Sequence, residues 1–246
     1  MTPSVTVIIP CYNEELGLPS LLERLNALRE DHRARDWHFL FVDDGSTDGT
    51  FARLLRAACD APWIEVARHH ENLGLGAALR TAFERVTSPI VCTIDSDCTY
   101  PPERLPELTA LIEAGADLAT ASAWHPDTAA AEGNRARLLL SRRVSTVYKW
   151  LIGQDVYTFT CLFRAYRSDL VKTIRFRGNG FSAVAEIFLK AVMSGHAVRE
   201  VAMPLERRRF GESKLKVSDA VVAHVHLITL TMFSLSLRRA RQAFVG

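Results

Sequence analysis

Two aspartates one residue apart, Asp95 and Asp97, are the residues whose spacing most directly indicates chemistry. They follow an apolar run, residues 89–94, with the composition of a buried strand. In an open α/β sheet, ligands bind at the carboxyl ends of the strands, where these carboxylates would emerge. Hard oxygen ligands in that place suit Mg²⁺ or Mn²⁺ held jointly with the phosphates of a substrate. The pair predicts a metal–diphosphate site, although aspartate is also common where a strand leads into a helix cap.

Two earlier strand ends carry related chemistry. The first predicted strand leads to Pro10, Tyr12 and Glu14, and the second to Asp43 and Asp44. A tyrosine ring can stack on a base, and Glu14 or Asp43 can accept hydrogen bonds from ribose hydroxyls or a base N–H. Because the carboxyl ends of parallel strands share one edge, the three ends together predict a nucleotide pocket with a metal. In the structural alternatives, Asn13 or Glu14 begins the next helix and Asp48 is an N-cap; we favour the cap for Asp48 and the site for Asp43.

The first half of the chain alternates strand and helix signals. Strands are predicted at residues 5–9, 37–42, 63–67, 89–94 and 117–121, and helices at 16–28, 51–59, 76–86 and 102–114. Strands separated by helices at this spacing indicate βαβ units. The expected fold class is α/β, with a central, mostly parallel sheet flanked by helices.

The second half is less regular. Residues 124–134 and 207–216 are predicted loops, 158–166 and 197–203 strands, and 135–151, 181–193 and 217–241 helices. There is no internal repeat and no low-complexity linker. We therefore expect one domain over residues 1–216, followed by a C-terminal helical extension over residues 217–246.

Charge is distributed unevenly, although the net charge is only +2. Acidic residues concentrate early in the chain, whereas residues 133–150 and 207–216 are rich in arginine and lysine. Such halves could hold a metal and phosphates between them, or the basic residues could simply be solvated. Five cysteines without a CxxC pair, and an N-terminus without a signal-peptide pattern, favour a reducing, cytosolic compartment. No apolar run reaches the length of a membrane span.

The motifs, in their order along the chain, resemble those of the family 2 glycosyltransferases with the GT-A fold. They are Val7-Ile-Ile-Pro-Cys-Tyr-Asn-Glu14, Val42-Asp-Asp-Gly-Ser-Thr-Asp-Gly-Thr50, Asn72-Leu-Gly-Leu-Gly-Ala77 and Asp95-Ser-Asp97. Phe163-Arg-Ala-Tyr-Arg167, Glu200-Val-Ala-Met-Pro204 and Arg208-Arg-Phe-Gly-Glu-Ser-Lys-Leu215 are similar to the branch of dolichol-phosphate mannose synthases and bacterial polyprenyl-phosphate glycosyltransferases. The resemblance covers residues 5–216.

The resemblance implies a role for each matching position. Pro10, Tyr12 and Glu14 would line the nucleoside pocket, with Asp43 beside the base and Asp44 next to it. Asp95 would lie near the sugar and diphosphate, and Asp97 would ligate Mg²⁺ or Mn²⁺. Arg137, Arg208, Ser213 and Lys214 would bind phosphates, the two arginines and Lys214 as part of the catalytic set. The implied partners are a nucleotide-diphosphate sugar, such as a UDP- or GDP-sugar, and a lipid phosphate.

Two segments depart from the family pattern. Residues 121–126 lack the arginine that usually follows the fifth strand, and His125 is the residue there that could contact a sugar or phosphate. Residues 158–164 replace both the acid and the glycine of the usual Asp-x-Thr-Ser-Gly-Phe-Arg. Because these segments would handle the sugar and the acceptor, the departures leave both identities open.

The expected reaction is an inverting glycosyl transfer. A lipid phosphate acceptor is already an anion and needs little general-base help, whereas a sugar hydroxyl needs a carboxylate within hydrogen-bond reach. Glu186 is the best candidate for that base, with Asp155 behind it; an acid in the first helical turn or paired to a basic residue is the alternative. A non-catalytic nucleotide-binding scaffold is a third interpretation. A pyrophosphorylase is disfavoured because its glycine-rich loop is absent after Ile9.

The predicted C-terminal helix carries a continuous apolar stripe. Val221, Val225, Ile228, Met232 and Leu235 recur at intervals of four and three, and Arg238, Arg239 and Arg241 follow. Such a helix can lie on an anionic membrane surface, giving a cytoplasmic protein peripheral on the inner face of the membrane, or dock against a membrane partner. It can equally be a core or homo-oligomer helix.

Overall fold

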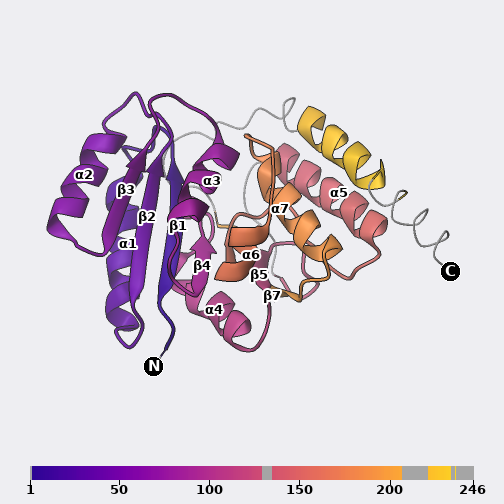
Figure 1. Cartoon of the computed structure of the whole chain (residues 1–246), viewed down its shortest axis with the longest axis horizontal. Helices are drawn as coiled ribbons and strands as arrows, with labels where there is room; N and C mark the ends of the chain where they lie inside the picture. The colour runs from indigo at the N-terminus through magenta and orange to yellow at the C-terminus, as the bar shows by residue number, and fades with distance from the viewer. Residues whose placement is uncertain (1, 129–134, 207–220, 234–235, 237–246) are drawn as a thin grey trace.

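The computed structural model describes residues 2–128, 135–206, 221–233 and 236 (Figure 1). Its strands form one sheet in the order β3-β2-β1-β4-β6-β5-β7. Their bounds are β1 (Val5–Cys11), β2 (Trp37–Asp43), β3 (Ile64–Arg68), β4 (Ile90–Thr93), β5 (Leu118–Ser122), β6 (Arg164–Arg167) and β7 (Val198–Ala202). Strands β3, β2, β1 and β4 are mutually parallel, as are β5 and β7, whereas β6 pairs antiparallel with both β4 and β5. The mostly parallel α/β sheet predicted from the sequence is confirmed.

Helices cover both faces of this sheet (Figure 1). Their bounds are α1 (Leu18–Asp31), α2 (Thr50–Asp60), α3 (Leu75–Arg85), α4 (Leu105–Glu113), α5 (Arg135–Ile152), α6 (Ser168–Thr173) and α7 (Ser182–Met193), with a 3₁₀ turn η1 at Pro102–Arg104. Residues 221–233 form a further helix. None of the helices within the described ranges is long and apolar enough to cross a membrane.

The period-two alternation of β1 explains the two layers. Val5, Val7 and Ile9 point into a core with α1, α2 and α4, whereas Ile8 points into a second core with α3, α5, α6 and α7. Burial on both faces explains why the central strands are continuous apolar runs rather than alternating ones. All five cysteines are free thiols.

The predicted strand over residues 158–166 is largely wrong, because only Arg164–Arg167 is a strand. The backbone before it is held by side chains instead of a neighbouring strand. The Glu200 carboxylate accepts hydrogen bonds from the amides of Tyr157 (2.8 Å) and Thr158 (2.9 Å), and the Ser145 hydroxyl accepts one from Phe159. The short helix α6 was also missed from the sequence.

Arg164 is fully buried at the start of β6. Its guanidinium donates to the carbonyls of Val184 (2.6 Å) and Phe159 (2.8 Å) and lies 4.7 Å from the ring centroid of Phe188. Within the described residues it forms no ion pair, so carbonyl dipoles and an aromatic face solvate its charge. Arg164 thereby ties the 156–163 segment and the first turn of α7 to the sheet.

The predicted helix over 217–241 is present over residues 221–233; the remainder, apart from residue 236, lies outside the described residues. Leu227 and Ile228 pack against the second core. The buried His224 and Tyr148 of α5 share a hydrogen bond of 3.0 Å between Nδ1 and Oη. The helix therefore packs on the body of the protein, and the division at residue 216 stays a prediction.

Replacing Arg164 with leucine should destabilise the fold by about 2–4 kcal/mol, because the carbonyls of Val184 and Phe159 would stay buried without donors. Urea unfolding measures this change. Arg167→Leu, three residues along the same strand, is the control: its guanidinium is half exposed and 3.4 Å from Asp117, so the loss should be below about 1 kcal/mol. Equal losses for both variants would contradict the role assigned to Arg164.

Candidate active site

Three strand ends meet at one level of the sheet. The β1–β2 register pairs Cys11 with Asp43, and the β1–β4 register pairs Ile8 with Thr93. The Ile94 amide extends the second pairing by bonding to the Ile8 carbonyl at 3.1 Å. Two residues beyond Thr93, Asp95 emerges at the level of Pro10. The parallel ladders thus bring together the strand ends that the sequence predicted to converge.

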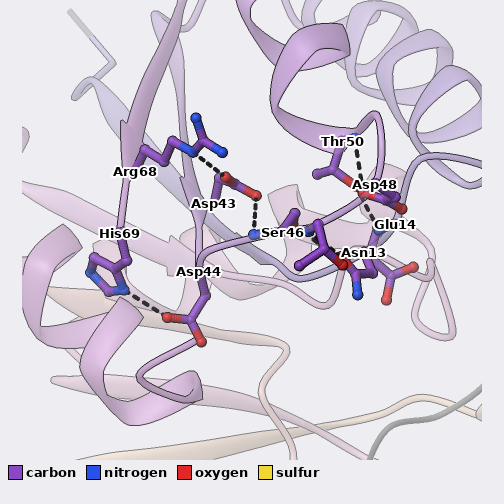
Figure 2. Close-up of polar contacts among 10 residues, drawn as sticks. Asn13, Glu14, Asp43, Asp44, Ser46, Asp48, Thr50, Arg68 and His69 are labelled. Carbon is purple, nitrogen blue, oxygen red and sulfur yellow. Dashed lines mark hydrogen bonds and ion pairs between the residues drawn. The ribbon is translucent and has the colours of Figure 1, made fainter. Parts of the chain in front are cut away.

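The loop after β1 is braced against the loop after β2 (Figure 2). The Asn13 amide donates to the Ser46 hydroxyl at 2.9 Å, and the Asn13 side-chain oxygen accepts from the Thr47 amide at 2.8 Å. The Glu14 amide donates to the Thr50 hydroxyl at 2.8 Å. Asn13 has a left-handed φ of 53°, a region that asparagine tolerates better than most residues. Neighbouring Tyr12 is consequently held at the sheet edge.

Glu14 does not begin a helix, because α1 starts four residues later, at Leu18. Asp48 lies at the start of α2, but it is not the N-cap that the sequence predicted. Its carboxylate accepts hydrogen bonds from the amides of Thr50 (2.9 Å), the first residue of α2, and Glu15 (3.3 Å). Asp48 stands one residue before the N-cap, which is Gly49.

Asp43 is fully buried at the end of β2 and has an unusual environment. Its Oδ1 accepts a hydrogen bond from the Ser46 amide at 3.3 Å. Its Oδ2 lies 3.2 Å from Arg68 Nε as an ion pair, but the alignment is too poor for a hydrogen bond, and Oδ2 accepts none (Figure 2). The Arg68 guanidinium also lies 4.0 Å above the Phe51 ring. Arg68 is a site-lining cation that sequence reasoning missed, since nothing in the sequence marks it apart from its position at the end of β3.

Asp44 faces the other way and serves the protein itself. Oδ1 accepts from the Leu73 amide (3.0 Å) and from His69 Nδ1 (2.6 Å), and Oδ2 accepts from the Gly74 amide (2.8 Å). Figure 2 shows the His69 contact. Asp44 therefore holds the 72–74 loop at the start of α3. Its place among the nucleotide-binding residues stays a prediction, since its carboxylate bonds to this loop and to His69.

The loop that Asp44 holds reaches across to the second half of the chain. Gly74 has a left-handed φ of 92°, and the Gly76 amide donates to the Asn179 carbonyl at 2.6 Å. A Cβ at Gly76 would stand 2.0 Å from the Gly178 carbonyl oxygen, so only glycine permits this approach. The glycine pair therefore makes a tight turn and a close backbone contact with the 178–179 loop.

Asp95 and Asp97 are half-buried just beyond β4. Asp97 Oδ1 accepts from the Thr99 amide at 3.0 Å, which fixes the turn. Glu14, Arg24, Ser96 and Asp97 are among the residues that line a small hollow between this turn and α1. Accessible oxygens of this kind fit a divalent cation. Across the residues that the structure describes, no group of three or more His, Cys, Asp or Glu side chains could hold a metal unaided.

The segments that depart from the family pattern lie next to Asp95. Burial raises the pKa of the Cys161 thiol to about 12, and the charge of Asp95 adds to that effect. Burial likewise raises the pKa of Tyr100, which is hydrogen-bonded to Cys161 and close to the Ala123 backbone. Residues 121–126 and 158–162 therefore border the same site as the aspartates.

Beside residues 121–126 and 158–162, sequence reasoning missed Glu200, although this residue begins the motif Glu200-Val-Ala-Met-Pro204. Burial raises its pKa, opposed by its bonds from the Tyr157 and Thr158 amides and from the Ser122 hydroxyl. Ser122 also bonds to the Thr158 hydroxyl at 2.8 Å. Glu200 thus positions one variable segment against the other. A carboxylate inside an apolar strand pattern was the available signal.

Glu186 is already engaged by the protein. Its carboxylate accepts from the amides of Gly178 (2.9 Å) and Arg177 (3.2 Å) and from Lys190 Nζ (2.7 Å). Partial burial acts to raise its pKa, but these bonds outweigh burial and leave the pKa below its ordinary value. These contacts match the alternative of a paired structural acid. Asp155 forms an exposed pair with Lys149 at 2.5 Å, and the Lys149 bond lowers the pKa of Asp155.

The basic candidates are only partly placed. Arg137 stands in the first turn of α5, but its side chain is outside the described part of the structure. Arg208, Ser213 and Lys214 fall in residues 207–220, also outside it. Their phosphate-binding roles stay predictions. His125 lies edge-on to the Tyr157 ring, with 5.4 Å between centroids.

Replacing Gly76 with alanine should lower the free energy of unfolding by about 1–3 kcal/mol, since the added methyl must push the 178–180 loop away. Chemical denaturation measures it. The control is Gly180→Ala in the same loop, where the added methyl meets no atom within 4 Å and should be neutral or slightly stabilising. A neutral Gly76→Ala would disprove the close contact.

Comparisons with known proteins agree with this geometry. The model of the family described as Glycosyl transferase family 2 matches residues 6–175. Polyprenol monophosphomannose synthase of Mycolicibacterium smegmatis is 32% identical over 89% of this chain and 83% of its own length. Undecaprenyl-phosphate 4-deoxy-4-formamido-L-arabinose transferase of Yersinia enterocolitica is 28% identical over 92% of this chain, which spans only 66% of that protein.

Solved structures show the same fold. Glucosyl-3-phosphoglycerate synthase from Mycobacterium tuberculosis, in complex with Mn²⁺ and UDP-glucose, superimposes with a TM-score of 0.70 at 20% identity. The match covers 95% of this chain and 79% of that one. The same enzyme with Mn²⁺, UDP and glucosyl-3-phosphoglycerate gives a TM-score of 0.68 at 19% identity, over 95% and 80% of the two chains. At these identities the likeness concerns the fold alone, which is GT-A.

Proposed function

The chain belongs to glycosyl transferase family 2 and is a glycosyltransferase, and we propose that it moves a sugar from a nucleoside-diphosphate sugar to a polyprenyl phosphate with inversion. One observation carries the donor half of this proposal. At a single edge of the parallel sheet, the buried Asp43 of β2 has an oxygen without a hydrogen-bond donor, and the half-buried Asp95 and Asp97 follow β4, on the other side of β1. The names of the two relatives support the acceptor half.

The nucleoside would lie over the braced loops after β1 and β2. A base N–H donating to Asp43 Oδ2 would satisfy a buried acceptor, which is worth more than the same bond at the surface. Tyr12 would stack on the base and Glu14 would accept from the ribose. Arg68, held over Phe51 beside Asp43, would border the same pocket. The unsatisfied oxygen thus supports a donor that carries a base with an N–H group.

The diphosphate would meet Asp95 and Asp97. Mg²⁺ or Mn²⁺ bound there would neutralise charge that develops on the departing nucleoside diphosphate. With two half-buried carboxylates present, the remaining ligands would come from the diphosphate and water. Arg137, Arg208, Ser213 and Lys214 would supply further positive charge and donors to the phosphates of donor and acceptor.

The acceptor phosphate would attack the anomeric carbon from the face opposite the leaving group. The sugar–oxygen bond to the diphosphate breaks as the bond to the acceptor oxygen forms, giving a polyprenyl-phospho-sugar and a nucleoside diphosphate. No proton has to leave the nucleophile, so no general base is required. The engagement of Glu186 by Lys190 and two amides, and its lowered pKa, favour this acceptor over a hydroxyl.

Transfer to a sugar or small-molecule hydroxyl is the second candidate. The observation that favours it is the altered pair of segments, 121–126 and 158–162, which lie beside Asp95. A screen of UDP-, GDP- and dTDP-sugars with Mn²⁺ or Mg²⁺, with and without polyprenyl phosphate, decides between the candidates. Nucleotide release that rises only when polyprenyl phosphate is present supports the proposal, and release that requires a hydroxyl acceptor overturns it.

Asp97→Asn should lower kcat by about 100-fold or more, because charge on the departing diphosphate loses its metal-assisted stabilisation. Mn²⁺ binding in the presence of nucleoside diphosphate, followed by electron paramagnetic resonance, should weaken in parallel. Asp60→Asn, at the exposed end of α2, is the matched control and should change neither quantity. Unchanged Mn²⁺ binding by Asp97→Asn would remove Asp97 from the metal site.

Glu186→Gln should lower kcat less than about tenfold with polyprenyl phosphate, since a phosphate acceptor needs no proton removed. The variant should lose stability, because the side-chain amide cannot replace the Lys190 ion pair. Lys190→Met is the control: it removes the same pair without touching the carboxylate, and should match Glu186→Gln in both activity and unfolding temperature. A fall of about 1,000-fold for Glu186→Gln alone would identify a general base and a hydroxyl acceptor.

A further inference from the structure

Exposed apolar side chains concentrate on two helices at one end of the molecule. Nine of the twelve large hydrophobic residues exposed in the described structure belong to α5 or to the helix of residues 221–233. They are Leu139, Val147 and Trp150 on α5, and Val221, Val222, Val225, Leu230, Met232 and Phe233 on the second helix. Trp150 is 78% exposed, Val222 70% and Phe233 62%. An apolar patch of this kind marks an interaction surface.

The 221–233 helix has its polarity inverted relative to a normal surface helix. The residues buried against the body are His224 and Thr231, with Leu227 and Ile228 half-buried between them. Of the stripe predicted from the sequence, Ile228 packs inward, whereas Val221, Val225 and Met232 are exposed. A helix stabilised only by its own protein would bury this stripe. The outward face of this helix is therefore suited to contact another molecule or surface.

The outward face of α5 combines apolar and cationic groups. Leu139, Arg143, Val147 and Trp150 recur at helical spacing, opposite the buried Val144 and Tyr148. Arg142 and Arg143 are exposed, and neither forms an ion pair among the described residues. No aspartate or glutamate occurs anywhere in α5 or in residues 221–233.

Helix α5 and the helix of residues 221–233 pack against each other. Tyr148 Oη and His224 Nδ1 are 3.0 Å apart with both side chains buried, and the rings are 5.9 Å apart between centroids. Figure 1 shows the helices side by side at the end of the molecule away from β2 and β3. Both pack one face on the second core, so their opposite faces point away from the body. We call these outward faces together the apolar end face.

Helix α5, which carries part of the apolar end face, also contacts the acceptor side of the site through Ser141, which is not part of that face. From α5, the Ser141 hydroxyl bonds to Thr160 (2.8 Å) and accepts from Trp124 Nε1 (3.2 Å). Thr160 lies in the 158–162 segment, next to Cys161 and hence to Asp95. A lipid surface against α5 would therefore present a phosphate headgroup close to the segments proposed to handle the acceptor.

We propose that the apolar end face docks on an anionic lipid bilayer, with Trp150, Val222 and Phe233 inserted at the headgroup–acyl boundary. An aromatic ring, aliphatic side chains and arginines without acidic neighbours match the chemistry of such an interface. A second copy of the chain fits less well, because two such faces would bring the exposed Arg142 and Arg143 of both copies together. This docking would bring the enzyme to the lipid-phosphate acceptor proposed above, so its purpose rests on that proposed function. The observations that support the docking itself do not depend on the acceptor.

Flotation of the full chain with phosphatidylcholine vesicles, with and without phosphatidylglycerol and always without polyprenyl phosphate, tests the docking. Wild type should bind anionic vesicles about tenfold or more tightly than neutral ones. Trp150→Gln/Val222→Gln/Phe233→Gln should weaken that binding by about tenfold or more. Arg142→Glu/Arg143→Glu should abolish the preference for anionic vesicles.

Matched controls use exposed residues elsewhere. Leu16→Gln/Leu55→Gln/Leu73→Gln removes the other three exposed apolar side chains and should leave vesicle binding within about twofold of wild type, because these leucines lie outside the apolar end face. Arg56→Glu, exposed on α2, is the charge control. Circular dichroism and unfolding temperature establish that every variant is folded.

Three outcomes overturn the docking: no binding of wild type to anionic vesicles, equal weakening by the control triple variant, or sedimentation showing a dimer that the Trp150 triple variant dissociates. The last outcome would assign the face to a second copy. Failure of the enzymatic proposal is separate: vesicle binding that depends on the apolar end face, with no transfer to polyprenyl phosphate in detergent, would leave the docking standing and remove the acceptor.

Discussion

The carboxylate of Asp44, buried at the end of β2, is the interaction on which the arrangement of the two halves depends. It accepts from the Leu73 and Gly74 amides and from His69, and so fixes the loop that begins α3. That loop in turn bonds to Asn179 through the Gly76 amide. The 177–178 backbone is held by Glu186 of α7. Buried hydrogen bonds to a charged group are strong, and this chain of contacts sets the distance between the donor side and the acceptor side of the site.

The two sides are built by different means. On the donor side, parallel ladders fix the level of Pro10, Asp43 and Asp95, because main-chain register leaves little freedom. On the acceptor side, the 156–162 segment has no ladder, and the buried charges of Arg164 and Glu200 hold it through the Phe159 carbonyl and the Tyr157 and Thr158 amides. Side-chain anchors of this kind allow the sequence between them to vary. One of the two departures from the family pattern, at residues 158–164, begins in that part of the chain.

A protein that acts on a lipid phosphate must also reach its acceptor. The described helices include none that could span a membrane, but α5 and the 221–233 helix expose most of the large apolar side chains of the described surface. Two polar residues of the second helix, His224 and Thr231, are buried against the body, where His224 bonds to Tyr148 and the Thr231 hydroxyl donates to the Leu227 carbonyl of its own helix. A soluble fold usually arranges such a helix the other way round, with its apolar face inward. The outward apolar face of this helix gives the protein a surface that can approach the lipid, as the proposed acceptor requires.

The sequence by itself determined the fold class, the order of the motifs and the convergence of three strand ends. The strand period can be read locally from the residues, and parallel pairing then brings the carboxyl ends of the strands to one edge of the sheet. The sequence could not distinguish Asp43 from Asp44, since adjacent strand residues point to opposite faces and only the packed sheet shows which one keeps an oxygen without a donor. Nor could it show that Glu186 is paired, that residues 158–163 leave the strand, or that the stripe from Val221 to Met232 faces outward. Those outcomes depend on partners such as Lys190, Glu200 and Tyr148, which lie far along the chain or across a helix and become neighbours only in the tertiary structure.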